Sequence, residues 1–163
     1  MKWLARWWPA LLWAAVIFNF STGTFTSENT SRFIIPALHW LFPHAAPETL
    51  ELMHHVIRKC GHLTEYFILS LLFLRGIRSG RSGARWSWAL AAILLVAAYA
   101  SLDEFHQSFV PGRTAAVTDV MLDTAGGAAA QLAAAFFLSS AGVREERAAT
   151  QQLKIAKNKS PSE

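Results

Sequence analysis

The sequence predicts an all-α integral membrane protein, in which four transmembrane helices form a bundle and an interfacial segment lies between the first two. The chain has 163 residues, of which 53% are hydrophobic and 16% are charged, whereas about a quarter of the residues in a soluble domain carry charge. The hydrophobic residues also form four nearly uncharged blocks, at 7–20, 63–74, 86–102 and 125–138. A lipid bilayer is the simplest solvent for such blocks.

The basic residues flank the predicted spans and therefore indicate topology. In a four-span arrangement, one side of the membrane receives Lys2, Arg6, the basic loop 75–85 and the basic tail after residue 142. The other side receives only Arg32, Arg58, Lys59 and Arg113. Because basic residues beside spans mark the cytoplasmic side, we expect a multi-pass protein of the cell membrane with both termini in the cytoplasm. The net charge of +4 then reflects topology, and nucleic acid is not expected as a partner.

The first part of the chain is expected to contain one span and one interfacial segment. The first helix should run from about Trp7 to Phe20, with Pro9 tolerated in its first turn. Residues 21–29 are polar and are predicted to form a loop. Residues 32–42 are apolar and aromatic but interrupted by Pro36. They are too short to cross a bilayer, so we expect them to lie at its surface.

The second helix is expected to run from Pro47 to Arg75, and its apolar part is short for a span. Residues 63–74 extend for roughly 18 Å as a helix, whereas a span needs about 20 residues. The helix must therefore draw His62 to the hydrocarbon boundary and place Glu65 below that boundary.

The third and fourth helices also carry charge at one end. The third helix, from about Trp86 to Phe105, ends in the acidic sequence DEFHQ. The fourth helix starts near Ala116 and places Asp119 and Asp123 before a run of small residues, which would let a neighbouring helix approach closely. We expect residues 1–142 to form the transmembrane domain. Residues 143–163 would form a charged cytoplasmic tail that is either an exposed helix or disordered.

Because successive spans alternate in direction, the polar ends of the last three helices should meet on the side opposite the basic loop. The residues expected there are Arg58, Lys59, His62, Glu65, Tyr66, Asp103, Glu104, His106, Gln107, Arg113, Asp119 and Asp123. An ionisable residue at membrane depth costs about 2.5–3.5 kcal/mol on insertion scales, and such residues usually face a bundle interior or a wet cavity and serve function. We therefore expect a functional site at this end.

Spacing places several of these side chains on shared helix faces. Asp119 and Asp123 are four residues apart, and paired carboxylates can bind a cation, hold an arginine or share a proton. His62 can act as a general base, as a general acid or as a donor to Asp119. His54, His55 and His106 are expected at the interface or in solvent. No spacing matches a recognised metal motif, so no metal site is predicted, and no cofactor is identified.

Three pieces of sequence together carry a family resemblance. They are Lys59-Cys60-Gly61-His62 with Tyr66, then Asp103-Glu104-Phe105-His106-Gln107 with Pro111-Gly112-Arg113, and finally Asp119-Val120 with Asp123 and Gly126-Gly127. In this combination the chain resembles the VanZ-like family over about residues 10–138. The family consists of small multi-span bacterial membrane proteins, and its founding member is linked to resistance to the glycopeptide teicoplanin. The resemblance implies that the protein lies in the membrane, but it implies no particular reaction. Asp123 departs from the family pattern, which carries Asn at this position.

Two functions from different classes fit these observations. In the first, the protein binds or acts on an anionic lipid-linked or cell-envelope molecule in a polar pocket at the outer leaflet, and so affects teicoplanin susceptibility. Proton transfer is then assigned to His62, Asp103, Glu104 and Asp119. Substrate binding is assigned to Lys59, Tyr66, Gln107, Arg113 and Asp123. In the second, the protein is a non-catalytic membrane module, and the charge cluster is a structural clamp.

Ion or proton passage is a third possibility that the sequence argues against. A through-pathway needs polar groups that continue to the other face of the membrane. Between residues 68 and 74, and between 89 and 98, the spans carry only Ser70. The polar residues therefore stop about halfway.

Overall fold

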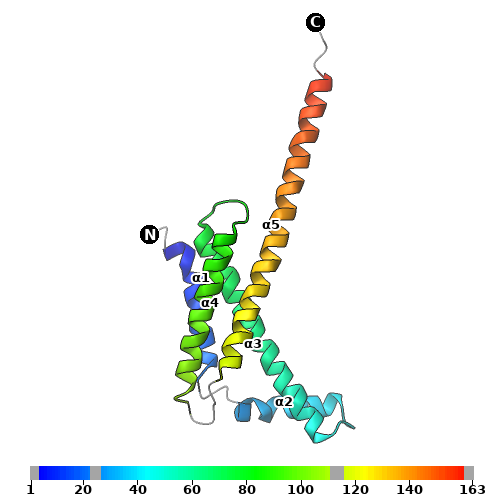
Figure 1. Ribbon diagram of the computed structural model, residues 1–163. Helices are drawn as coiled ribbons and strands as arrows, with labels where there is room; N and C mark the ends of the chain where they lie inside the picture. Colours follow the sequence, from blue (N-terminus) through cyan, green and yellow to red (C-terminus); the bar gives the residue numbers. More distant parts are fainter. Residues whose placement is uncertain (1–3, 23–26, 111–115, 160–163) are drawn as a thin grey trace.

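The computed structural model describes residues 4–22, 27–110 and 116–159, with side chains described as far as residue 140. These residues form five α-helices and no strand, namely α1 (Leu4–Phe20), α2 (Ser27–Leu41), α3 (Pro47–Arg78), α4 (Trp86–Gln107) and α5 (Val117–Lys159). Helices α1, α3, α4 and the first half of α5 pack side by side, whereas α2 lies at one end of them against α3 (Figure 1). The predicted all-α class is confirmed.

Helix α2 differs from the expected segment at both its start and its middle. It begins at Ser27, inside the stretch that was predicted to be a loop, and it continues through Pro36. The Thr30 hydroxyl donates to the carbonyl of Ser27, 3.2 Å away, and the Ser31 hydroxyl donates to the carbonyl of Glu28, 2.7 Å away. Small polar residues can therefore form the first turns of a helix as readily as they form a loop, because their hydroxyl groups bond to nearby backbone carbonyls. Pro36 removes one backbone donor without ending the helix.

Helices α3 and α5 are longer than a bilayer crossing requires. They contain 32 and 43 residues, which is about 48 Å and 65 Å at the helical rise, against a hydrocarbon core of about 30 Å. The start of α3 projects beyond the bundle to meet α2, and the second half of α5 projects beyond the other helices at the opposite end (Figure 1). The tail was predicted to be either an exposed helix or disordered, and the structure has a helix there, as far as Lys159. A boundary at residue 142 stays a prediction.

The core lies where α1, α3 and α4 meet. Ile17 from α1, Tyr66 and Leu69 from α3, and Val96 and Ala100 from α4 form one buried cluster. Two aromatic side chains also bond across helices. The indole of Trp13 donates to the carbonyl of Glu65, 2.9 Å away, and the hydroxyl of Tyr99 donates to the carbonyl of Ala14, 2.5 Å away. Buried backbone acceptors between the helices are thereby satisfied.

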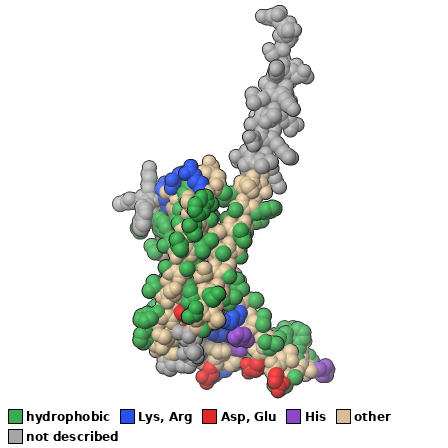
Figure 2. Space-filling view, viewed as in Figure 1, with side chains coloured by type: hydrophobic (Ala, Val, Ile, Leu, Met, Phe, Trp, Pro, Cys, Tyr) green, Lys and Arg blue, Asp and Glu red, His purple; other side chains and the backbone are tan. Residues whose placement is uncertain are grey.

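Two of the described helices are long and apolar enough to cross a membrane. They are α4, over Trp86–Gln107, and α5, over Val117–Ser140. Large hydrophobic side chains on both point away from the bundle, for example Leu94 and Leu132, which are 60% and 75% exposed. Helix α1 is apolar but has only 17 residues. Apolar side chains cover the length of the bundle between its two ends (Figure 2), as expected for a protein surrounded by lipid.

His54 holds α2 against the start of α3, outside both of these candidate spans. The sequence placed this histidine at the interface or in solvent, and the solvent alternative is wrong, because its side chain is 2% exposed. Its Nε2 lies 3.1 Å from the hydroxyl of Thr30 on α2. His55, the next residue, is exposed as expected. The position of α2 decides which of the two adjacent histidines faces it. The sequence around the histidines does not indicate that position.

We expect acid to loosen the packing of α2 on α3. Burial of the ring lowers the pKa of His54 below its usual 6.5, the nearby Arg58 lowers it further, and Glu51 opposes both. The unfolded segment therefore takes up a proton before the folded one, and stability is lost as the pH falls below about 6.5. The midpoint of thermal unfolding should be lower at about pH 5.5 than at about pH 7.5. This difference should shrink in His54→Asn and persist in His55→Asn, and equal shrinkage in both would contradict the prediction.

Candidate functional site

Polar side chains gather at the end of the bundle where α2 lies, here called the polar end. Acidic side chains and histidines occupy this end, and a group of arginines occupies the opposite end (Figure 2). The end of α1, the middle of α3, the end of α4 and the start of α5 all meet at the polar end (Figure 1). The structure thus places most of the predicted site residues at one end, in three groups and a cavity.

The first group surrounds Asp103, which is 4% exposed. One carboxylate oxygen accepts a hydrogen bond from the hydroxyl of Ser21, at the end of α1. The other oxygen accepts from the amide of Gln107, 2.8 Å away, and from the hydroxyl of Tyr66, 3.3 Å away. Asp103 therefore joins α1, α3 and α4. Sequence analysis missed Ser21 because it belongs to a polar stretch without helical spacing.

The second group joins the start of α5 to its neighbours. Lys59 forms an ion pair with Asp119, and both side chains are about one-third exposed, at 34% and 32%. On α4, the carboxylate of Glu104 accepts a hydrogen bond from the backbone N–H of Ala116, 2.9 Å away. An orphan donor ahead of α5 is thereby satisfied. Both contacts fix α5 against its neighbours.

The third group is His62 with Asp123. The Nδ1 atom of His62 lies 3.8 Å from a carboxylate oxygen of Asp123. The sequence allowed His62 to be a donor to Asp119; in the structure Lys59 forms an ion pair with Asp119, and His62 as a donor to Asp119 stays a prediction. The side chain of Asp123 is 1% exposed, and neither of its oxygens has a hydrogen-bond partner among the described residues. A buried carboxylate in this state costs free energy, which is typical of a functional residue.

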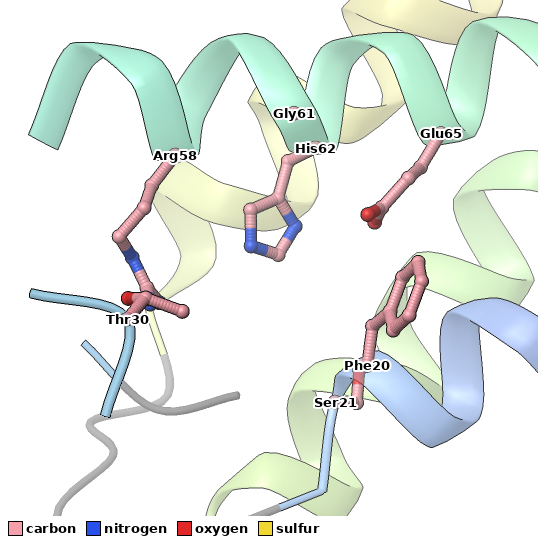
Figure 3. Close-up of a pocket in the computed structure, with 7 residues that line it drawn as sticks. All are labelled: Phe20, Ser21, Thr30, Arg58, Gly61, His62 and Glu65. Carbon is pink, nitrogen blue, oxygen red and sulfur yellow. The ribbon is translucent and has the colours of Figure 1, made fainter. Parts of the chain in front are cut away.

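A cavity of about 230 Å³ opens beside His62. Arg58, His62 and Glu65 come from one face of α3 and point into it, opposite Phe20 and Ser21 (Figure 3). Thr30 of α2 closes one side, where its hydroxyl accepts a hydrogen bond from the Arg58 guanidinium, 3.1 Å away. Since Nδ1 of His62 faces Asp123, the other edge of the ring is the edge presented to the cavity. The cavity thus combines a cation, an imidazole and a carboxylate.

Several predicted site residues lie outside this cavity. Asp103, Tyr66 and Gln107 are buried in the first group, and their proposed chemical roles stay predictions. Arg113 lies outside the described residues. Arg58 and Glu65 were expected at this end but were given no role, although their spacing from His62 of four and three residues places all three on one face. Thr30 could not be found from sequence, because its approach depends on the position of α2.

The donor set at the polar end suits proton transfer and anion binding better than metal binding. Among the described residues, no three His, Cys, Asp or Glu side chains converge as a metal site would require. Cys60 is exposed. The ring of His106 stacks at 4.6 Å on Phe18 instead of facing the cavity.

The fold and this site define a small, all-helical protein with a polar cavity at one end of its bundle and, among the described helices, two that are long and apolar enough to cross a membrane. A scan against family models identifies it further, because the model described as VanZ/LLP1 matches residues 7–138. The chain belongs to the VanZ-like family, as its motifs predicted. No curated protein and no solved structure matches it.

Proposed function

We propose that the chain crosses the cell membrane four times, with both termini and the basic loop 79–85 in the cytoplasm. Helix α1 has 17 residues and extends for about 26 Å, and the part of α3 from His62 to Arg78 has the same length. Both are close to the thickness of a thin bilayer, about 27 Å. The arginines at one end and the acidic groups at the other agree with the positive-inside rule. The polar end would then face outward.

We propose that the cavity at the polar end binds an anionic lipid-linked or cell-envelope molecule. The observation that carries this proposal is that Arg58, His62 and Glu65 line one cavity (Figure 3). His62 also lies beside the buried Asp123. The guanidinium of Arg58 suits a phosphate or carboxylate, to which it can bond through two N–H groups. Arg113, which precedes α5 in the sequence and lies outside the described residues, is proposed as a second anion ligand.

In this proposal His62 transfers a proton, and the carboxylate of Asp123 orients the imidazole ring of His62. A carboxylate that faces one nitrogen of an imidazole orients the ring and stabilises its charged form, so that the other nitrogen can give or take a proton in the cavity. Asp103 and Glu104 hold the helices that shape the cavity, and the Lys59–Asp119 pair does the same. These residues therefore act as positioning residues.

The competing function is a non-catalytic membrane module whose polar residues only clamp the helices. The Asp103 network and the Lys59–Asp119 pair favour it, because each joins separate helices. A structural clamp requires neither a buried carboxylate at Asp123 nor a polar cavity. An ion pair that is one-third exposed contributes only about 0.2–1 kcal/mol, so a clamp built on it would be weak.

Teicoplanin susceptibility of a sensitive bacterial host that expresses the chain tests the proposed function. Arg58→Gln and His62→Gln should lose any protection that the unmodified chain gives, at equal amounts of membrane-inserted protein. Arg32→Gln and His55→Gln are matched controls, since both residues are exposed on the same side and do not line the cavity. Protection that survives in the first two variants would favour the clamp. No protection by the unmodified chain would overturn the link to teicoplanin.

A further inference from the structure

The basic end of the molecule contains a second, larger cavity that the proposed function does not use. It has a volume of about 370 Å³ and lies between α4 and α5, with the end of α3 at its mouth. The two helices separate toward this end (Figure 1). Its walls include Ile93 from α4 and Ala128, Leu132 and Ala135 from α5. Leu74 and Trp88, which also line it, form a buried apolar cluster with Ala92.

The mouth of this groove is strongly cationic. Arg78 and Arg85 line it, and Arg6, Arg75 and Arg81 lie at the same end. None of these five arginines forms an ion pair within the residues whose side chains are described. Their hydrogen bonds go to neutral acceptors, such as the carbonyl of Arg81 for Arg78, at 3.2 Å, and the carbonyl of Arg6 for Arg75, at 3.0 Å. Within those residues, no acidic side chain compensates the positive charge at the mouth.

Trp88 gives the mouth a defined shape. The guanidinium carbons of Arg81 and Arg85 lie 5.1 Å and 5.0 Å from the centre of its indole ring, within the range of a cation–π interaction. The indole is 8% exposed and so acts as a rigid platform. Stacking restrains the two guanidinium groups, which lowers the entropy that an anion must overcome to bind them.

The length of the groove fits one leaflet of a bilayer. Along α5 its lining runs from Ala128 to Leu138, and the ten helical steps between these residues span about 15 Å. Half of a hydrocarbon core of about 30 Å is also about 15 Å. At the inner end, the Gln131 amide donates to the carbonyl of Ser70, 3.1 Å away, and to its hydroxyl, 2.7 Å away. Gln131 therefore adds a polar contact to the lining near the inner end of the groove.

We propose that this groove is a binding site for one anionic phospholipid of the leaflet at the basic end. An acyl chain lies between α4 and α5, and the phosphate lies against Arg78 and Arg85. The occupant is a lipid because the groove is apolar, open along its side and one leaflet deep. It is anionic because the guanidinium groups at the mouth have no acidic partner within the described side chains. The site is separate from the polar cavity and stands whether or not that cavity is catalytic.

Native mass spectrometry of the full chain in mild detergent tests this proposal. Phosphatidylglycerol and phosphatidylcholine with identical acyl chains are added in turn. One phosphatidylglycerol should stay bound per chain under conditions that strip phosphatidylcholine. The double variant Arg78→Gln/Arg85→Gln should lower this retention roughly 30-fold, since each basic residue near an anionic lipid contributes about a fivefold preference. Arg75→Gln removes one charge at the same end without lining the groove and should retain the lipid, whereas the matched single variant Arg78→Gln should lower retention about fivefold.

Two further arms identify the occupant. Ala135→Phe fills the groove and should release phosphatidylglycerol although every arginine remains. Glycerol phosphate, which has the headgroup charge but no acyl chain, should not bind. Equal retention of the two lipids by the unmodified chain would overturn the proposal. Loss in Arg75→Gln as large as in the double variant, or a lipid-free dimer as the dominant species, would also overturn it.

Discussion

Replacing Asp123 by Asn is expected to abolish the protection given by the chain while leaving the amount of folded, membrane-inserted protein unchanged or higher. The carboxylate is 1% exposed and its oxygens have no hydrogen-bond partner among the described residues. Asn has nearly the same shape as Asp, so the substitution should not disturb packing. Because the family pattern carries Asn here, the expected dependence on a carboxylate is a property of this chain and not of the family pattern. An amide cannot support a charged imidazole as a carboxylate does. Loss of general acid–base catalysis typically lowers a rate about 10²–10⁴-fold.

Asp119→Asn is the matched control for this prediction. The substitution makes the same chemical change four residues away on the same helix, but it removes the ion pair with Lys59. The pair is partly exposed, so the loss should be about 0.2–1 kcal/mol of stability, with protection largely retained. Protection that survives in Asp123→Asn would show that the cavity acts without the His62–Asp123 pair. A parallel fall of protection and folded protein in Asp123→Asn would instead support the clamp.

The sequence was sufficient for the features that depend on local pattern. The start of α3 at Pro47 and of α4 at Trp86 follow from helix signals in the sequence. The gathering of His62, Asp103, Asp119 and other polar groups at one end follows from the alternation of helices. The family followed from motifs spaced along most of the chain.

The pairing of these residues could not be predicted, because it depends on helix rotation and on segments far apart in sequence. No local sequence pattern indicates that Lys59 pairs with Asp119 and that His62 lies beside Asp123. Ser21 reaches Asp103 across 82 positions of the chain. The groove at the basic end also depends on the angle between α4 and α5. The order and lengths of the helices do not predict that angle. Long-range packing thus decides which polar residues brace the fold and which line a cavity.

Replacing Gly126 by Ala is expected to destabilise the protein more than the same replacement at any other glycine that the structure describes. A Cβ at this position would lie 2.7 Å from the backbone carbonyl oxygen of Leu63 on α3, which is closer than a carbon and an oxygen can approach. The obstacle is backbone, so the two helices must separate. Overpacking of this kind costs about 1–3 kcal/mol. The thermal midpoint in detergent should therefore fall by several degrees.

Gly61→Ala makes the identical change inside α3 and is the control for this prediction. A Cβ there meets nothing within 4 Å, so only the helix-propensity gain remains, about 1 kcal/mol in favour of Ala. The two substitutions should therefore shift the thermal midpoint in opposite directions. A midpoint unchanged by Gly126→Ala would mean that α3 and α5 are not in backbone contact at Leu63. The α3–α5 contact also positions Asp123 against His62, so Gly126→Ala should lower protection as well, in proportion to the folded protein that is lost.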